Sequence, residues 1–143
     1  MASSESKANG ITLDQAQQVV EAARKKAEEI GVMMNIAVVD EGNNLVAFAH
    51  MDGAWLGSIN IAQNKAYTAR AFDMSTKDLG AAAQPGKPLF GIEASNHGQL
   101  IIFAGGIPLA ADGRIVGAIG VSGGTVESDQ EVAEAGVAAF GKE

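Results

Sequence analysis

Two histidines, His50 and His97, are the only imidazoles in this 143-residue chain, which contains no cysteine. A neutral imidazole can act as a general acid or base, bind a divalent metal ion or ligate haem iron. His97 lies four residues after Glu93, so a helical turn there would place both side chains on one face to share a proton or a metal ion. The lack of cysteine excludes disulfides, zinc-thiolate sites, iron–sulfur clusters and thiol nucleophiles.

His50 follows a β-branched, apolar run and precedes Met51-Asp52-Gly53. We expect His50 to face solvent, to pair with Asp52 or to line a pocket at the rim of the sheet. Met51 is more typical of core packing than of a metal site, although thioethers can bind iron. An ordinary loop histidine is the alternative interpretation at both histidine positions.

Two features could bind an anion. Ser122-Gly123-Gly124-Thr125 joins a predicted strand to a predicted helix, where backbone amides could meet a carboxylate or phosphate. The competing interpretation is that Gly123 and Gly124 only permit a tight turn and close packing, as do Gly105 and Gly106. Lys65, on an alanine-rich helix, could contact an anionic ligand or project into water.

Composition narrows the function classes. Ten basic and 17 acidic residues give a net charge of −7, and the basic residues are scattered, which disfavours nucleic-acid binding. No apolar run is long enough to span a membrane. Residues 1–10 lack the apolar centre of a signal peptide, so we expect a disordered tail, one domain over 11–143 and a cytoplasmic protein.

Hydrophobic periodicity and turn signals predict the secondary structure. Thr12 and Gln15 form a capping-box pattern at the start of a helix, as do Ser128 and Glu131. Asp112-Gly113 between two apolar runs predicts a hairpin, because both turn positions need positive φ. The predicted elements are helices over 12–30, about 58–72, 75–83 and from 128, and strands over 36–40, 45–49, 100–104, 107–111 and 114–121.

This order, with two antiparallel hairpins, predicts an α+β fold in which a sheet of about five strands is flanked by helices. A long connection over 85–98 lies between the two halves and is a candidate functional loop. Alanine-rich helices such as the one with Ala62, Ala66 and Ala69 permit close contacts but bury little apolar surface in a small monomer. We therefore expect a homo-oligomer.

Several motifs in this order resemble the GlcG/HbpS family, which includes the C-terminal domain of PduO-type cobalamin adenosyltransferases. The resemblance covers residues 12–140 or so, and no single motif is diagnostic. The motifs are Ala37–Gly42, Met51–Ala54, Lys65–Ala69, Gly105–Leu109 and Asp112–Gly124.

The resemblance implies a profilin-like sandwich and dimers that assemble into tetramers or octamers. It also implies haem binding, which in some members accompanies haem degradation or redox sensing. Two departures matter: His50 stands where the family often has arginine, and residues 12–30 lack the helix histidine that ligates iron in some relatives. The positions that the resemblance assigns to a pocket or interface are Asp52, Lys65, Gly105, Gly106, Gly123 and Gly124.

Two function hypotheses follow. In the first, His97 or His50 ligates haem iron while Lys65 or amides near Gly123 meet the propionates. In the second, a small enzyme of a catabolic cluster acts on a small polar or carboxylate substrate, with or without a divalent metal at His97 or His50. One of these histidines is then the general acid or base, oriented by Glu93 or Asp52. A structural subunit without a small-molecule ligand is the third possibility.

Overall fold

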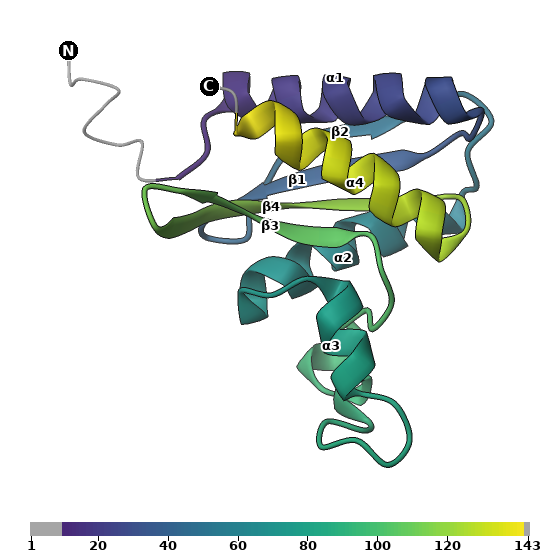
Figure 1. The fold of residues 1–143 in the computed structure, drawn as a ribbon, viewed down its shortest axis with the longest axis vertical. Helices are drawn as coiled ribbons and strands as arrows, with labels where there is room; N and C mark the ends of the chain where they lie inside the picture. The colour runs from purple at the N-terminus through teal and green to yellow at the C-terminus, as the bar shows by residue number, and fades with distance from the viewer. Residues whose placement is uncertain (1–9, 142–143) are drawn as a thin grey trace.

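A four-stranded antiparallel sheet in the order β2-β1-β4-β3 separates two helical layers in the computed structural model, which describes residues 10–141. Helices α1 and α4 cover one face of the sheet, and α2 covers the other (Figure 1). The α+β sandwich expected from the sequence is thus confirmed, with four strands. The elements are α1 (Leu13–Ile30), β1 (Asn35–Asp40), β2 (Leu45–His50), α2 (Gly57–Phe72), α3 (Thr76–Ala82), η2 (Ile92–Ala94), η3 (Asn96–Gly98), β3 (Gly106–Ala111), β4 (Arg114–Ser122) and α4 (Val126–Phe140).

Helix boundaries follow from side-chain caps. The predicted box at α1 is present, because Thr12 and Gln15 each accept the other's backbone N–H, at 3.1 and 2.9 Å. The predicted box at Ser128 and Glu131 is wrong. Thr125 has extended φ and ψ angles and its hydroxyl accepts the Ser128 N–H, so the cap of α4 lies three residues before the predicted one.

Both hairpins form as predicted. Asp112 and Gly113 have φ angles of 54° and 75°, the positive values that a two-residue turn requires. In the first hairpin, the carboxylate of Asp40 accepts the backbone N–H groups of Gly42 and Asn44 at 3.0 and 2.9 Å. These local hydrogen bonds fix the register that places His50 opposite Asn35.

The strand predicted over 100–104 does not form, which is why the sheet has four strands. This segment packs against helices: the Ile101 N–H donates to the Thr68 hydroxyl, and the Ile102 carbonyl lies directly against Gly80 of α3. Leu100 and Ala104 are buried there without a strand partner. A short apolar run indicates burial, but it does not say whether a sheet or a helix covers it.

Close approach of α2 to the sheet explains its small residues. A Cβ atom on Gly120 of β4 would overlap the carbonyl oxygen of Ala62, so this glycine is needed for the contact. Ala62, Ala66 and Ala69 are fully buried in this layer together with Ala118 of β4. The alanine stripe therefore belongs to a helix–sheet contact within one chain.

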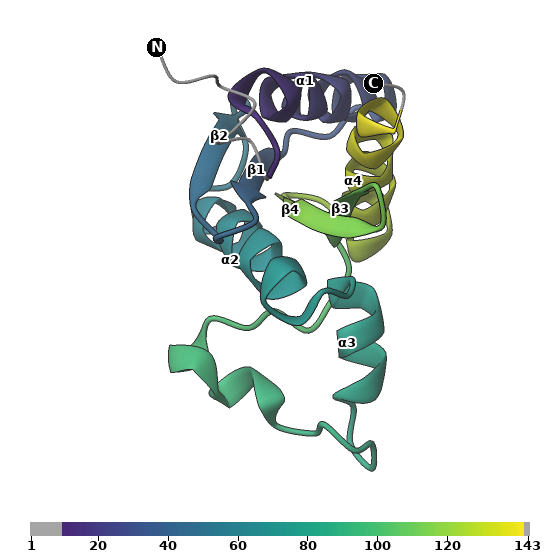
Figure 2. The same cartoon turned by 90° about the vertical axis from the view of Figure 1, so that its left-hand side faces the viewer.

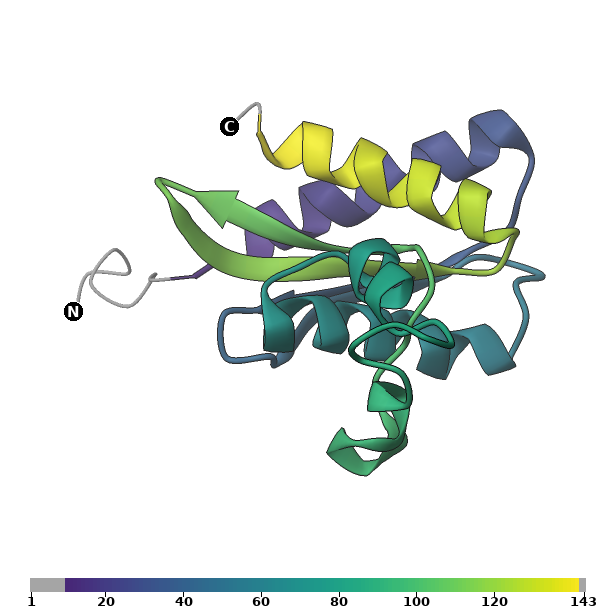
Figure 3. The same cartoon turned by 60° about the horizontal axis from the view of Figure 1, so that its bottom comes forward.

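The segment from α3 through η3 projects away from the sheet, on the side of α2 (Figures 2 and 3). It exposes two large apolar side chains, Leu89 and Phe90. Among residues 10–141, no helix combines the length and apolar character needed to cross a membrane. The tail predicted over residues 1–10 lies outside the described part of the chain except for Gly10.

Candidate functional site

An open hollow of about 310 Å³ lies between α1 and the end of β2. A pocket at the sheet rim was one of the three surroundings considered for His50 from the sequence. His50 is exposed on its wall, and Asp52 lines it from the following turn. In the described residues, no hydrogen bond joins Asp52 to His50, so the expected carboxylate–imidazole pair is not formed. The lining residues are Arg24, Glu28, Met33, Ala49, His50, Met51 and Asp52.

Asn35 fixes the orientation of the His50 ring. The two residues are directly opposite each other in the β1–β2 ladder, and the His50 Nδ1 atom lies 2.6 Å from the Asn35 Oδ1 atom. Asn35 is fully buried, and its Nδ2 atom donates to the Trp55 carbonyl at 3.0 Å. An imidazole at the edge of the sheet is thus anchored by a buried amide, while the rest of its ring remains exposed.

The lining of the His50 hollow includes one cation, Arg24, and one exposed apolar side chain, Met33. The Arg24 guanidinium forms ion pairs with Glu21 and Glu28 on the outer side of α1. Trp55 and Leu56 are 68% and 81% exposed, and the Trp55 backbone is tied to this site through Asn35. Such apolar side chains in water commonly mark a surface that binds something.

Met51 is a core residue, as the sequence analysis favoured. It is buried, and its sulfur accepts the backbone N–H of Met34 at 3.3 Å. Met51 therefore supports the floor of the hollow and is not poised as a ligand.

His97 lies in a different part of the molecule. It sits in η3, whereas His50 ends β2 and lines a hollow together with Arg24 of α1. The segment from α3 onward, which includes η3, projects beyond α2 (Figure 1). The expected helical face shared by Glu93 and His97 is wrong, because Ser95 is extended between two separate 3-10 turns and His97 has a φ of 58°. Both side chains are exposed, and the structure brings neither of them to His50.

Lys65 is a buried ion-pair residue, so the expectation that it projects into water is wrong. Its Nζ atom donates to the Asp129 carboxylate at 2.9 Å and to the Val121 carbonyl at 2.8 Å, and it lies 4.9 Å from the centre of the Phe103 ring. Burial lowers the pKa of the Lys65 amine, and the charge of Asp129 acts in the opposite direction. The pair links α2, β4 and α4, and it leaves this ammonium no ligand-facing surface.

The Gly123-Gly124 turn is shaped by packing. A Cβ atom on Gly123 would come within 2.6 Å of the Met33 carbonyl oxygen, and one on Gly124 would overlap the Ser128 hydroxyl. The Gly124 N–H donates to the second oxygen of Asp129 at 2.9 Å. A carboxylate of the protein itself therefore already binds a backbone amide that was considered, from the sequence, as part of an anion site.

The backbone amides of Gly105 and Gly106 are also hydrogen-bonded within the protein. The Gly105 N–H donates to the Gln130 side chain at 3.1 Å, and the Gly106 N–H donates to the Thr76 hydroxyl at 2.9 Å. Both glycines lie against Lys65, where a side chain would not fit. These contacts assign them to close packing of α2 and β3.

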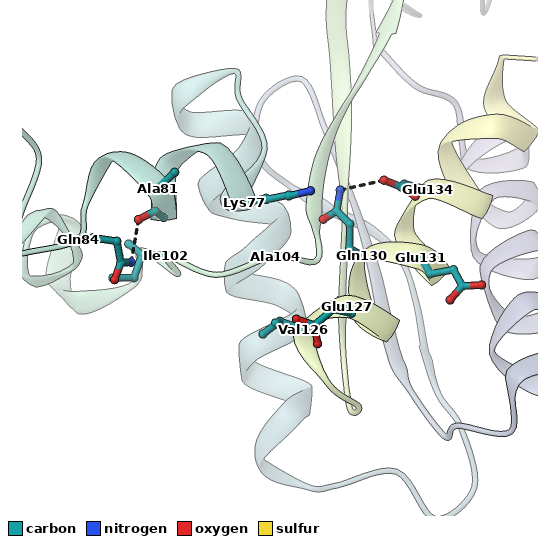
Figure 4. A pocket seen from close by; sticks show the side chains of 11 residues that line it. Lys77, Ala81, Gln84, Ile102, Ala104, Val126, Glu127, Gln130, Glu131 and Glu134 are labelled. Carbon is teal, nitrogen blue, oxygen red and sulfur yellow. Dashed lines mark hydrogen bonds between the residues drawn. The ribbon is translucent and has the colours of Figure 1, made fainter. Parts of the chain in front are cut away.

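A second hollow of about 480 Å³ separates α3 from α4 (Figure 4). Lys77 reaches into it from α3, and three glutamates face it from α4: Glu127, Glu131 and Glu134. The Gln130 amide donates to Glu134 at 3.3 Å across this wall. The sequence analysis missed this groove, although glutamates at intervals of four and three residues on one helix were its visible signal.

A multi-ligand metal centre is not assembled in residues 10–141. These residues contain no cluster of three or more histidine, aspartate or glutamate side chains that could hold a metal ion. The divalent metal considered at His50 and His97 therefore has no ready-made ligand set there.

Comparison with known proteins adds to this geometry. A family model described as "Haem degrading protein HbpS-like" matches residues 11–138. A Citrobacter freundii protein, the uncharacterized 15.0 kDa protein in the dhaT-dhaS intergenic region, is 42% identical over 130 residues, which are 91% of this chain and 92% of that protein.

Two solved structures are similar over nearly the whole chain. Klebsiella pneumoniae protein ORFY superposes with a TM-score of 0.92 at 38% identity, covering 100% of this chain and 99% of that one. A PduOC:heme complex gives a TM-score of 0.88 at 33% identity, covering 91% of this chain and 94% of that one. The family resemblance found in the sequence is therefore confirmed.

Proposed function

Because the chain belongs to the family of HbpS-like haem-degrading proteins, we propose that it binds haem, with the His50 imidazole as an iron ligand. The related PduOC structure is a haem complex, which supports haem as the bound molecule. The observation that carries the assignment to His50 is its geometry: an exposed imidazole, held by a buried amide, lines an open hollow. When bound, haem would supply a redox-active iron whose behaviour its axial ligand helps to set.

The donor set around His50 fits this group. Met33, Trp55 and Leu56 offer exposed apolar surface for the porphyrin faces and edges. Arg24 can turn one guanidinium edge from a glutamate to a propionate, a pairing that suits its planar fork. Arg24 takes the place in this proposal that the sequence analysis gave to Lys65, since Lys65 is already paired inside the protein.

His97 is the weaker candidate. It lies in an exposed turn with a left-handed backbone, and within the described residues no hydrogen bond holds its ring as Asn35 holds that of His50. The acid–base alternative also has less support, because His50 is oriented by the Asn35 amide and not by a carboxylate. Haem binding is common to the degrading and sensing roles, and the proposal is made at that level.

We propose further that a second copy of the chain completes the haem site. One chain supplies only an open hollow, while ligand sites commonly enclose most of their ligand. Trp55 and Leu56, which follow Asp52 in the chain and are exposed, provide apolar surface for such a contact. A dimer-based tetramer or octamer would repeat this contact by symmetry.

A haemin titration followed by absorbance tests the proposal. The parent protein and His97→Ala should give the same saturable, shifted Soret band with one haem per chain. His50→Ala should lose that shifted band, and its unfolding midpoint should show that it remains folded. Identical spectra for His50→Ala and the parent would refute ligation by His50, and a parent spectrum equal to that of free haemin would refute haem binding.

A further inference from the structure

We infer that Asn35 is a positioning residue that keeps the proton of neutral His50 on Nδ1 and so presents an unprotonated Nε2 atom to iron. This inference rests on the proposed function for its last step, while the tautomer itself is a property of the protein without haem. Asn35 was not singled out by the sequence, and it touches His50 rather than the ligand.

The orientation of the Asn35 amide follows from its two partners. The Trp55 carbonyl oxygen can only accept a hydrogen bond, so the atom 3.0 Å from it must be the amide nitrogen of Asn35. The reverse orientation would bring two acceptor oxygens together at this distance. The Asn35 Oδ1 atom must therefore face His50.

The tautomer follows from the same chain of contacts. The Asn35 Oδ1 atom is an acceptor, so the His50 Nδ1 atom, 2.6 Å away, must donate. Neutral imidazole carries one proton, which leaves the Nε2 lone pair available. Metal-bound histidines in proteins commonly use this arrangement, in which a second group holds the other ring N–H.

Burial makes the arrangement rigid. Asn35 is fully buried at the start of β1, between His50 of β2 and Ser122 of β4 in the strand register. A buried amide is costly to leave without hydrogen-bond partners, so Asn35 favours the orientation that satisfies both its oxygen and its nitrogen. The Asn35 amide therefore has one orientation, and its hydrogen bond to Nδ1 fixes the orientation of the His50 ring.

Nitrogen NMR of the haem-free protein tests the first step. In mildly alkaline buffer the ¹⁵N shifts of His50 should report the Nδ1–H tautomer, whereas Asn35→Leu should move His50 toward the Nε2–H form that free histidine prefers. Asn35→Asp keeps an acceptor opposite Nδ1 but loses the donor to the Trp55 carbonyl, so it should keep the parent tautomer at a lower stability. Asn64→Leu is the matched control, because Asn64 bonds to Asn60 on α2. Observation of Nε2–H in the parent would overturn the inference even if no variant folded.

Haemin binding tests the second step. Asn35→Leu should weaken haemin binding by roughly 10–100-fold, the usual effect of removing the group that orients a metal-bound histidine. It should also shift the iron–histidine stretching frequency of the ferrous complex, which a merely structural role would not move, and Asn35→Asp should recover affinity. Unchanged affinity and frequency in a folded Asn35→Leu would refute the positioning role. If the titration shows that His50 does not ligate haemin, while NMR of the parent shows the Nδ1–H tautomer, only the iron-binding step is refuted.

Discussion

Replacement of Lys65 by methionine should destabilise the protein strongly. The substitution keeps most of the side-chain volume but removes the ammonium that faces Asp129 at 2.9 Å and the Val121 carbonyl at 2.8 Å. The Asp129 side chain is 3% exposed, so its charge would remain without a counterion and with little access to water. Its only remaining partner among these groups is the Gly124 N–H.

The magnitude follows from this burial. Removing one member of a buried ion pair typically costs about 3–5 kcal/mol, because the charge left behind is uncompensated. For a domain of this size that corresponds to a fall in unfolding midpoint of roughly 10–20 °C. The double variant Lys65→Met with Asp129→Leu removes both charges, so its cost should be smaller than the sum of the two single costs by about 1–3 kcal/mol.

Urea unfolding at neutral pH, followed by circular dichroism, measures these differences. Lys26→Met is the matched control, since Lys26 pairs with Glu131 at 3.4 Å on the surface and should cost less than ~1 kcal/mol. A Lys65→Met protein as stable as the control variant, or strictly additive costs in the double variant, would refute the reasoning.

Three further predictions concern stability and are checked by the same unfolding assay. Gly120→Ala should cost ~3 kcal/mol, the upper end of the usual cost of overpacking, because its Cβ would overlap the Ala62 carbonyl; a cost below ~1 kcal/mol would mean that α2 can move away from the sheet. Thr12→Ala should cost ~1 kcal/mol by removing the α1 cap, and no change would show that the cap is dispensable. At pH values between the lowered pKa of Lys65 in the folded protein and its ordinary pKa of 10.5, Lys65 holds its proton in the unfolded chain but not in the folded one. Unfolding free energy should therefore rise with pH across that window in the parent and not in Lys65→Met; equal slopes would contradict the shift.

The elements that rest on local signals were predictable from the sequence. The Thr12 cap and the Asp112-Gly113 turn each depend on residues within a few positions, and both are present. The predicted strand over 100–104 failed because its burial comes from helices that are distant in sequence. The cap at Ser128 failed because Thr125 offers the same chemistry one turn earlier.

The candidate site was predictable only in part. His50 and Asp52 were identified from residue type and do line a hollow. Lys65 could not be recognised as buried, because its partner Asp129 is 64 residues away in the chain. Asn35 gave one usable signal, since it is a polar residue inside an apolar run that reads as a buried strand, but its contact with His50 depends on the hairpin register.

The most direct measurement is a structure of the haem-loaded protein. We expect iron bonded to the Nε2 atom of His50, with the Nδ1 atom still hydrogen-bonded to the Asn35 amide and the porphyrin against Trp55 and Met33. Iron bonded to His97, or a haem that leaves His50 unligated, would contradict the central claim.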